Sequence, residues 1–326
     1  RINRQELADE IVASGFPAVN VSWYEFPGPK ITRCTVDERE TGRMAAEYFL
    51  GAGFHHFGYC GPRYRPGYHD LLAEEYRSVL QAAGYACDSY RGPTDSSQAV
   101  PWDQQLASLV SWVSQLPRPT AVLCWSAARG RQVTEACHYA GIRVPDDVAV
   151  LGGEHDDLMN EISDPPLSTI DQPGERIGHE AARILSQMMG GEGIPESPAL
   201  FSPTRVIVRH STDILAVDDP VVRTALRLIH EQAREGVNVA GIISQMHIAR
   251  RALEQRFVEH LGRTPAAEIR RVRIEVAKQL LVDTDLNMGE IARKCGFREQ
   301  DLFSRTFRRV LGVPPSQYRG VHRHAE

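Results

Sequence analysis

One short phrase occurs twice in the last quarter of the chain, first from Leu253 to Pro265 and again from Phe303 to Pro315. In each copy three apolar residues follow one another at steps of four, which is the spacing of one helix face, and a glycine ends the run. A shorter amphipathic stretch precedes each copy, Val239 to Met246 and Met288 to Cys295. The repeat predicts two helix-turn-helix units, an arrangement suited to two successive stretches of DNA.

The segment between the two units predicts a helix that connects them. It runs from about Ala266 to Val282, and 17 residues span about 25 Å at roughly 1.5 Å per residue. Such a helix is suited to holding two recognition helices about one DNA turn apart, roughly 34 Å. Each recognition helix would then enter the major groove, where the base edges carry a full donor and acceptor code.

The formal net charge of −5 hides an asymmetry along the chain. From Pro220 to Glu326 there are 19 Lys and Arg against 12 Asp and Glu, a net charge of +7. The first 219 residues carry 18 against 30, a net charge of −12. A basic third on an acidic body is typical of a phosphate-binding module attached to a regulator. Alone it is a weak signal, because many surface helices are rich in arginine.

Length and composition place the chain among globular proteins of two or more domains, with 326 residues and 42% hydrophobic residues. No apolar run approaches the roughly 18 residues of a membrane span. The six cysteines form no C-x-x-C pair, so we expect buried free thiols and a cytoplasmic location. The first residue is Arg1, in the middle of an element, and we expect that residues are missing before it.

The first 210 residues alternate between strand-like and helical patterns. Nearly continuous apolar strands between helices predict parallel sheets covered on both faces. The predicted strands are 18–23, 56–60, 121–125, 148–151 and 205–209, and the predicted helices are 38–50, 71–83, 104–116, 131–140 and 174–189.

A sheet of this kind binds ligands at the carboxyl ends of its strands, which directs attention to 60–68, 126–129, 153–157 and 171–172. Neither G-x-G-x-x-G nor a P-loop follows a strand, and there is no G-x-S-x-G elbow. We therefore expect no enzyme activity and no cofactor. Two stretches, 55–60 and 154–157, contain His, Cys or acidic residues that could suggest a metal site. Neither has the spacing of metal ligands, so we expect no metal.

The acidic body resembles the LacI/GalR-type sugar sensors over about residues 17–210. The similarity lies in Val36 to Leu50, Gly53 to Gly61, Ile142 to Gly152 and Pro166 to Gln172. It implies an α/β periplasmic-binding-protein-like fold of two lobes with sugar in the cleft. The first lobe lacks its opening strands and helices, so we expect it to be incomplete.

Residues 220–320 resemble the AraC/XylS-type DNA-binding domain, an all-α domain with two helix-turn-helix units. The similarity lies in Leu253 to Phe257, Ile291 to Phe297, Phe303 to Phe307 and Gly312 to Arg319. This order of sensor and reader is similar to that of the xylose-operon activators. We expect a sensor over residues 1–212, a linker over 213–219 and the DNA-binding domain over 220–326.

Both recognition helices have polar residues at their starts. In the first unit Leu253, Phe257 and Leu261 face inward, and in the second we expect Phe303, Phe307 and Val310 to do so. Arg suits guanine, Gln suits adenine and Glu accepts from cytosine, and the resemblance also implies base contacts here. The alternative is a solvated face with ordinary i,i+4 pairs. The predicted DNA-binding residues are Arg250, Arg251, Glu254, Gln255, Gln300, Asp301, Ser304 and Arg305, with Arg308 and Arg309 on phosphate.

The resemblance also implies a sugar site. Arg129 and Gln172 match pocket residues of related sensors, Tyr68 stands where an aromatic residue or Arg commonly lines the cleft, and Glu154-His155 replaces Asp-Asn. Carboxylates, Arg and an aromatic plate suit a neutral polyol. The predicted ligand-binding residues are Arg129, Glu154, His155, Gln172 and Tyr68, with Trp125 as a stacking face. Alternatively Arg129 forms only an ion pair or a helix-end contact, Glu154 is a surface cap and Trp125 belongs to the core.

Together these observations predict a sugar-responsive transcription regulator, an activator that responds to D-xylose or a related monosaccharide. We expect operator DNA, a sugar effector, a second copy of the chain and RNA polymerase as partners, and no membrane. The replacement at Glu154 leaves another pentose, a hexose or a sugar acid open. The alternative from a different class is a carbohydrate-binding or carbohydrate-processing protein in which the basic third has no DNA role.

Overall fold

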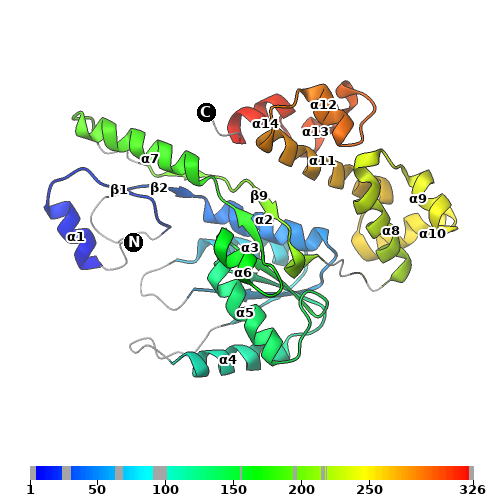
Figure 1. Ribbon diagram of the computed structural model, residues 1–326, viewed down its shortest axis with the longest axis horizontal. Helices are drawn as coiled ribbons and strands as arrows, with labels where there is room; N and C mark the ends of the chain where they lie inside the picture. Colours follow the sequence, from blue (N-terminus) through cyan, green and yellow to red (C-terminus); the bar gives the residue numbers. More distant parts are fainter. Residues whose placement is uncertain are drawn as a thin grey trace. The chain divides into compact units, whose positions relative to one another are not determined.

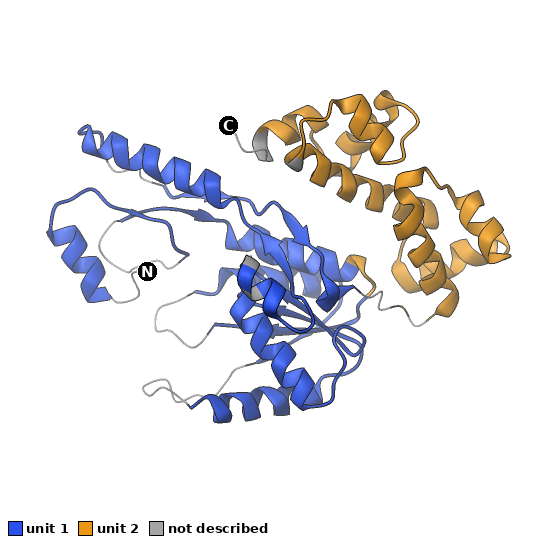
Figure 2. Ribbon diagram, viewed as in Figure 1, with its two compact units in different colours: residues 1–50, 54–214 blue, residues 51–53, 215–326 orange. Residues whose placement is uncertain are grey.

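The structure is a computed structural model that describes residues 5–23, 31–62, 69–90, 101–154, 156–193, 197–213, 217 and 219–322. The chain forms two compact units, which Figure 2 distinguishes by colour. Unit 1 contains residues 1–50 and 54–214, and unit 2 contains residues 51–53 and 215–326. Unit 1 is an α/β structure, whereas the described elements of unit 2 are helical.

A six-stranded sheet is the centre of unit 1 (Figure 1). Its strands are parallel except for the last, which pairs antiparallel with its neighbour. The two middle strands are buried along their whole length, because they carry apolar residues on both faces. In spatial order the strands are β4 (Cys87–Tyr90), β3 (His56–Cys60), β5 (Thr120–Cys124), β6 (Val148–Gly152), β7 (Ser168–Asp171) and β9 (Arg205–Ile207).

Helices connect these strands, as expected for a doubly wound sheet. They are α2 (Glu38–Gly51), α3 (Leu71–Ala82), α4 (Trp102–Gln115), α5 (Ala127–Tyr139) and α6 (Asp157–Ile162). An apolar cluster of the unit joins α4 and α5 to the sheet through Leu109, Val133, Val122 and Val150.

A second, smaller sheet lies beside α7 (Gly174–Met189) in unit 1. Its three described strands are all parallel: β1 (Val19–Asn20), β2 (Thr32–Val36) and β8 (Ala199–Phe201). Cys34 packs with Ala181 and Ile184 of α7 in a small core. The described part of the chain also contains α1 (Gln5–Ala13) before this sheet. The predicted two-lobed α/β fold is confirmed.

The observed elements of unit 1 depart from the sequence prediction in several places. The strand expected over 18–23 is reduced to β1, and β2, β4, β7 and β8 had no predicted counterpart. Helix α5 begins at Ala127 rather than 131, because Ser126 caps it by accepting from the Arg129 amide at 3.3 Å. The prediction of parallel pairing is wrong for β9, which follows α7 and β8 and returns antiparallel to β7.

Unit 2 consists of seven α-helices with a short 3₁₀ turn after the first, within the described residues. Two apolar cores divide it. The first gathers α8, α9 and α10 around Phe257, and the second gathers α12, α13 and α14 around Phe303 and Phe307. The helices are α8 (Pro220–Gln232), α9 (Val239–Met246), α10 (Arg250–Leu261), α11 (Pro265–Asp283), α12 (Met288–Lys294), α13 (Gln300–Leu311) and α14 (Pro315–His322).

Asp219 fixes the first turn of α8, the first helix of unit 2. Its carboxylate caps α8 by accepting from the Val221 and Val222 amides at 2.8 and 2.9 Å. The same carboxylate forms an ion pair with Arg256 of α10, and His260 lies 3.7 Å away. Burial raises the pKa of Asp219, but these hydrogen bonds lower it overall. The first turn of α8 is therefore joined to α10 by charge as well as by the apolar core.

Helix α11 supplies residues to both cores, Ile269 to the first and Ile274, Ala277 and Leu281 to the second. It also carries Glu268, whose side chain is completely buried.

Two arginines and a histidine surround the Glu268 carboxylate: Arg263 at 2.5 Å, Arg271 at 2.7 Å and His230 at 3.5 Å. Burial alone raises its pKa, yet the hydrogen bond with His230 and the charges of Arg271 and Arg263 bring the pKa far below its ordinary value. This cluster joins α8, α11 and the turn before α11.

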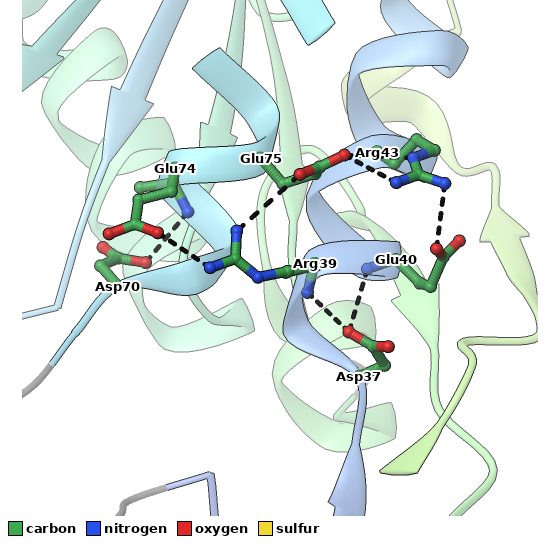
Figure 3. A network of polar contacts seen from close by, with 8 residues as sticks. Asp37, Arg39, Glu40, Arg43, Asp70, Glu74 and Glu75 are labelled. Carbon is green, nitrogen blue, oxygen red and sulfur yellow. Dashed lines mark hydrogen bonds and ion pairs between the residues drawn. The ribbon is translucent and has the colours of Figure 1, made fainter. Parts of the chain in front are cut away.

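In unit 1 a polar network holds α2 against α3 (Figure 3). Asp37 caps α2 by accepting from the Arg39 amide at 2.9 Å. Arg39 reaches Glu74 at 3.2 Å, and Arg43 reaches Glu75 at 2.8 Å. These pairs are partly exposed, so each contributes at most about 1 kcal/mol, and the apolar packing beneath them does more. That packing depends on Gly42, where an added Cβ would overlap the backbone of Leu72 and Tyr76.

We predict that Gly42→Ala destabilises the α2–α3 pair by about 1–3 kcal/mol, because the new methyl group has no room. The matched control is Gly178→Ala in the middle of α7, where nothing lies within 4 Å of an added Cβ. The control is expected to be neutral or stabilising by up to about 1 kcal/mol through helix propensity. Hydrogen–deuterium exchange of peptides from α2, α3 and α7 measures both effects, and equal effects would contradict the packing argument.

We predict that Glu268→Gln destabilises unit 2 by about 3 kcal/mol, because Arg263 and Arg271 lose a buried anion. The control is Glu275→Gln on the same helix, where the carboxylate is 50% exposed and pairs with Lys278 at 2.9 Å. It should change stability by less than about 0.5 kcal/mol. Hydrogen–deuterium exchange of peptides from α10 and α11 is the measurement.

The same cluster predicts a dependence on pH. The folded-state pKa of Glu268 lies below its ordinary value of 4.5, so its stabilisation is present above that value and is lost as the pH falls below it. The difference in stability between wild type and Glu268→Gln should therefore narrow in acid. A constant difference between neutral and acidic pH would show that the carboxylate charge is not the cause.

Candidate functional site

Two tight turns present α10 and α13, which we refer to as the recognition helices. Asn238 caps the start of α9 by accepting from the Gly241 amide at 3.0 Å, and His247 follows the end of the helix in a left-handed conformation. Helix α12 begins with a capping box between Asn287 and Glu290. Both recognition helices end at a left-handed glycine, as the repeat predicts.

The predicted inward faces are mostly as expected. Leu253 and Phe257 in α10 and Phe303 and Phe307 in α13 are fully buried. The prediction for Val310 is wrong, because this residue is 49% exposed and the next one, Leu311, packs against the core. Leu311 is four residues after Phe307, so it continues the helix face, whereas Val310 turns away.

All eight predicted DNA-binding residues lie on the outer side of the recognition helices. Six are exposed, and Glu254 and Ser304 are partly buried. Arg250 forms an i,i+4 pair with Glu254 at 2.9 Å, and Arg305 donates to the Asp301 carbonyl at 3.4 Å. These contacts orient the side chains, and their assignment to base reading stays a prediction. Arg308 and Arg309 follow one turn later on α13, and both are exposed.

In unit 1 the carboxyl ends of the parallel strands form one continuous edge. The backbone ladder extends past the strands, because the Trp125 amide donates to the Cys60 carbonyl at 2.9 Å and the Gly153 amide donates to the Cys124 carbonyl at 2.7 Å. The side chain of Gln172 donates to the Gly153 carbonyl at 3.3 Å. Residues that follow β3, β5, β6 and β7 are thus brought together at this edge.

Arg129 lies at this edge, in the first turn of α5. Its Nε donates to the Gly61 carbonyl at 3.0 Å, and its Nη1 donates to Gln132 at 2.7 Å. The side chain therefore crosses from α5 to the end of β3 and is held at two points. The guanidinium has further N–H donors in a fork of fixed geometry, and these can donate hydrogen bonds to a hydroxyl or a carboxylate.

The other predicted ligand residues have different outcomes. Glu154 and Gln172 are partly buried and follow β6 and β7 at the same edge as Arg129. Tyr68 and His155 lie outside the described residues. Trp125 is partly buried and packs edge-on against Trp23, with ring centroids 4.5 Å apart. Whether any of these residues binds a ligand stays a prediction.

Two residues at the edge were missed by the sequence analysis. Trp23 precedes β2 in the smaller lobe, and its contact with Trp125 joins residues far apart in the chain. Asp70 caps α3 and accepts from the Tyr59 hydroxyl at 2.8 Å. Burial raises its pKa, although hydrogen bonds from Tyr59 and the Ala73 amide favour the charged form. An aspartate directly before a helical pattern is a cap signal that could have identified Asp70.

Comparison with known proteins follows this division of the chain. Residues 46–212 match the family model of the periplasmic binding protein-like domain. Residues 242–320 match a helix-turn-helix domain. The chain belongs to the periplasmic binding protein-like domain family, and it also carries a helix-turn-helix domain. Within the described residues, none of the helices is long and apolar enough to cross a membrane.

The chain is similar to xylose operon regulatory proteins. It is 31% identical to that of Escherichia coli (strain K12) over 256 residues, which are 78% of this chain and 62% of the relative. It is 27% identical to that of Haemophilus influenzae over 293 residues, 89% of this chain and 75% of the relative. The chain thus spans less than two thirds of the length of the Escherichia coli relative.

Solved structures agree with this similarity. The structure of the xylose-binding transcription activator XylR is 26% identical, with a TM-score of 0.55, over 99% of this chain and 86% of that chain. A complex of the transcriptional regulator CelR with cellobiose is 23% identical, with a TM-score of 0.50, over 64% of this chain and 63% of that chain. The second likeness concerns the fold alone.

Proposed function

We propose that the chain is a DNA-binding transcription regulator, not an enzyme, that acts in the cytoplasm and responds to a monosaccharide. The observation that carries the proposal is the pair of helix-turn-helix units, α9–α10 and α12–α13, which share α11. Similarity to the xylose-binding activator over nearly the whole chain supports D-xylose or a related sugar as the effector.

The DNA-binding half of the proposal rests on geometry and charge. Helix α11 has 19 residues, which span about 28 Å at roughly 1.5 Å per residue. That length suits recognition helices in successive major-groove segments, which lie about 34 Å apart. Residues 220–326 carry a net charge of +7. A basic surface of this kind binds DNA because it releases counterions from the phosphates. Arg250, Arg251 and Arg305 would read bases, and Arg308 and Arg309 would contact phosphate.

The sugar-binding half rests on the edge of the six-stranded sheet. Arg129 and Gln172 offer donors there, and Glu154 and Asp70 offer acceptors. A neutral polyol needs both, because each of its hydroxyls donates and accepts. The indoles of Trp23 and Trp125 add an apolar surface between the two lobes.

Coupling between the two activities requires a ligand that prefers one arrangement of the lobes. Only a difference in affinity between two states can shift their populations. In the proposed mechanism sugar favours a dimer in which both copies hold their recognition helices on paired half-sites, where RNA polymerase would be recruited. Linking two weak contacts in this way raises the overall affinity through effective concentration.

We predict that DNA binding by the full chain weakens at least about tenfold between about 50 and 200 mM salt, because phosphate contacts release counterions. Arg308→Ala should lower the slope of log Kd against log salt by about one. Fluorescence anisotropy with labelled duplex DNA measures both. Arg183→Ala is the control: this exposed arginine of α7 pairs with Glu180 in unit 1 and should leave the slope unchanged.

The salt experiment separates the regulator from the alternative of a carbohydrate-binding protein whose basic third is structural. Binding that is equally weak at both salt concentrations would contradict the DNA-binding proposal. Equal loss of slope in Arg308→Ala and Arg183→Ala would contradict the placement of phosphate contacts on α13.

We predict that one member of a monosaccharide panel binds the full chain and that Arg129→Ala weakens its binding at least tenfold, or about 1.4 kcal/mol. Loss of a charged hydrogen-bond donor is the reason. Glu154→Ala should weaken the same sugar. Arg131→Ala is the control, because Arg131 is exposed on the same helix two residues later. Calorimetry against xylose, other pentoses, hexoses and sugar acids is the measurement.

Thermal unfolding of each variant accompanies this experiment, because Arg129 also holds the Gly61 carbonyl. Unchanged sugar affinity in both Arg129→Ala and Glu154→Ala would contradict the placement of the sugar site at the sheet edge. Tightest binding of a hexose or sugar acid would replace xylose as the effector and would leave the site in place.

A further inference from the structure

We infer that the third residue of each recognition helix reads the C5 methyl group of a thymine. These residues are Ala252 in α10 and Leu302 in α13. The inference rests on the proposed function, because both helices must enter the major groove. It adds an apolar contact to a face on which the sequence analysis considered polar residues alone.

The first observation is the position of Leu302. Its side chain is 46% exposed, although Phe303 beside it is fully buried. A single exposed leucine is ordinary on a protein surface, so exposure alone indicates nothing. Leu302, however, follows Asp301 directly and lies three residues before Arg305, a spacing that makes side chains neighbours on a helix. An apolar group thus borders the polar face in the first turn, the part of a recognition helix that approaches bases.

The second observation comes from the repeat. Aligning Leu253 with Phe303 places Ala252 at the position of Leu302. The flanking polar residues change between the copies, with Arg251 in place of Asp301 and Gln255 in place of Arg305. The position between them stays apolar in both copies, and Ala252 is partly exposed. Both units therefore present an apolar group at the same place on the helix, among different hydrogen-bonding partners.

Thymine is the base that matches an apolar group at this place. Its major-groove edge presents one carbonyl acceptor and the C5 methyl group, and apolar side chains contact that methyl. Cytosine has a hydrogen atom there and leaves the leucine against water. Burying one methyl-sized group changes affinity about fourfold. Two such thymines should lie about one turn of DNA apart, because the two helices occupy successive segments of the groove.

The test uses duplexes that the full chain selects from a random-sequence DNA library. In the tightest duplex each thymine is replaced in turn by deoxyuridine, which lacks only the C5 methyl group. Wild type should lose about fourfold in affinity at two thymines that lie about ten base pairs apart. Leu302→Ser should bind the parent duplex about fourfold more weakly and lose its sensitivity at one of the two positions, because the apolar contact is replaced by a hydroxyl, while the other position stays sensitive.

Val310→Ser is the matched control, because Val310 is 49% exposed on the same helix but lies in its last turn. It should bind every duplex as wild type does. The inference is overturned if no thymine is sensitive to deoxyuridine, if Leu302→Ser weakens all duplexes alike, or if Val310→Ser acts in the same way. If the selected duplex binds with a steep salt dependence but its affinity does not change when thymine methyl groups are removed, this inference alone is overturned. Failure to select any duplex overturns the proposed function as well.

Discussion

The arrangement of unit 2 depends on α11 being buried in two cores at once. Ile269 belongs to the core around Phe257, and Ile274, Ala277 and Leu281 belong to the core around Phe303 and Phe307. A helix shared in this way cannot turn about its axis without disturbing both cores. The Glu268 carboxylate adds a second restraint, because two arginines and a histidine from three places in the chain hold it. The rotation of one recognition helix relative to the other is therefore set by packing inside the unit.

The charge pattern on the recognition helices has a further meaning for specificity. Arg250 and Glu254 are paired with each other before any DNA is present. A guanidinium held by a neighbouring carboxylate loses less rotational freedom when it binds, but it must share its donors with that carboxylate. If α10 reads bases as proposed, the first unit would accept a narrower choice of bases than an unpaired arginine would allow. In the second unit Arg305 donates only weakly to a backbone carbonyl and is less restrained.

Local patterns were enough to predict the elements whose residues alternate with a clear period. Helices α7 and α9 and strand β3 have the predicted bounds, because caps and apolar spacing mark them in the sequence. Strands β1 and β8 have two and three residues and depend on partners elsewhere, so no local pattern marks them. Val310 was misplaced because two adjacent apolar residues fit the spacing, and only packing chose Leu311.

The candidate site could be predicted only in part for the same reason. The rule that ligands bind at the ends of parallel strands located the stretches 126–129, 153–157 and 171–172. The family resemblance then singled out Arg129, Glu154 and Gln172 within them. It could not locate Trp23, which reaches Trp125 from the other lobe. Asp70 was missed although it carries a cap signal, because a cap residue ordinarily serves only its helix. Its hydrogen bond with Tyr59 of β3 becomes visible only in three dimensions.

The extension of the ladder beyond the strands separates stability from specificity in unit 1. The bonds between Trp125 and Cys60 and between Gly153 and Cys124 are made by main-chain atoms. Main-chain hydrogen bonds of this kind do not depend on which side chains the neighbouring positions carry. Position 154 can therefore exchange one polar residue for another while the scaffold beneath keeps its shape. If this edge is the proposed sugar site, selection could change the preferred effector through few substitutions, with little need for compensating changes in the core.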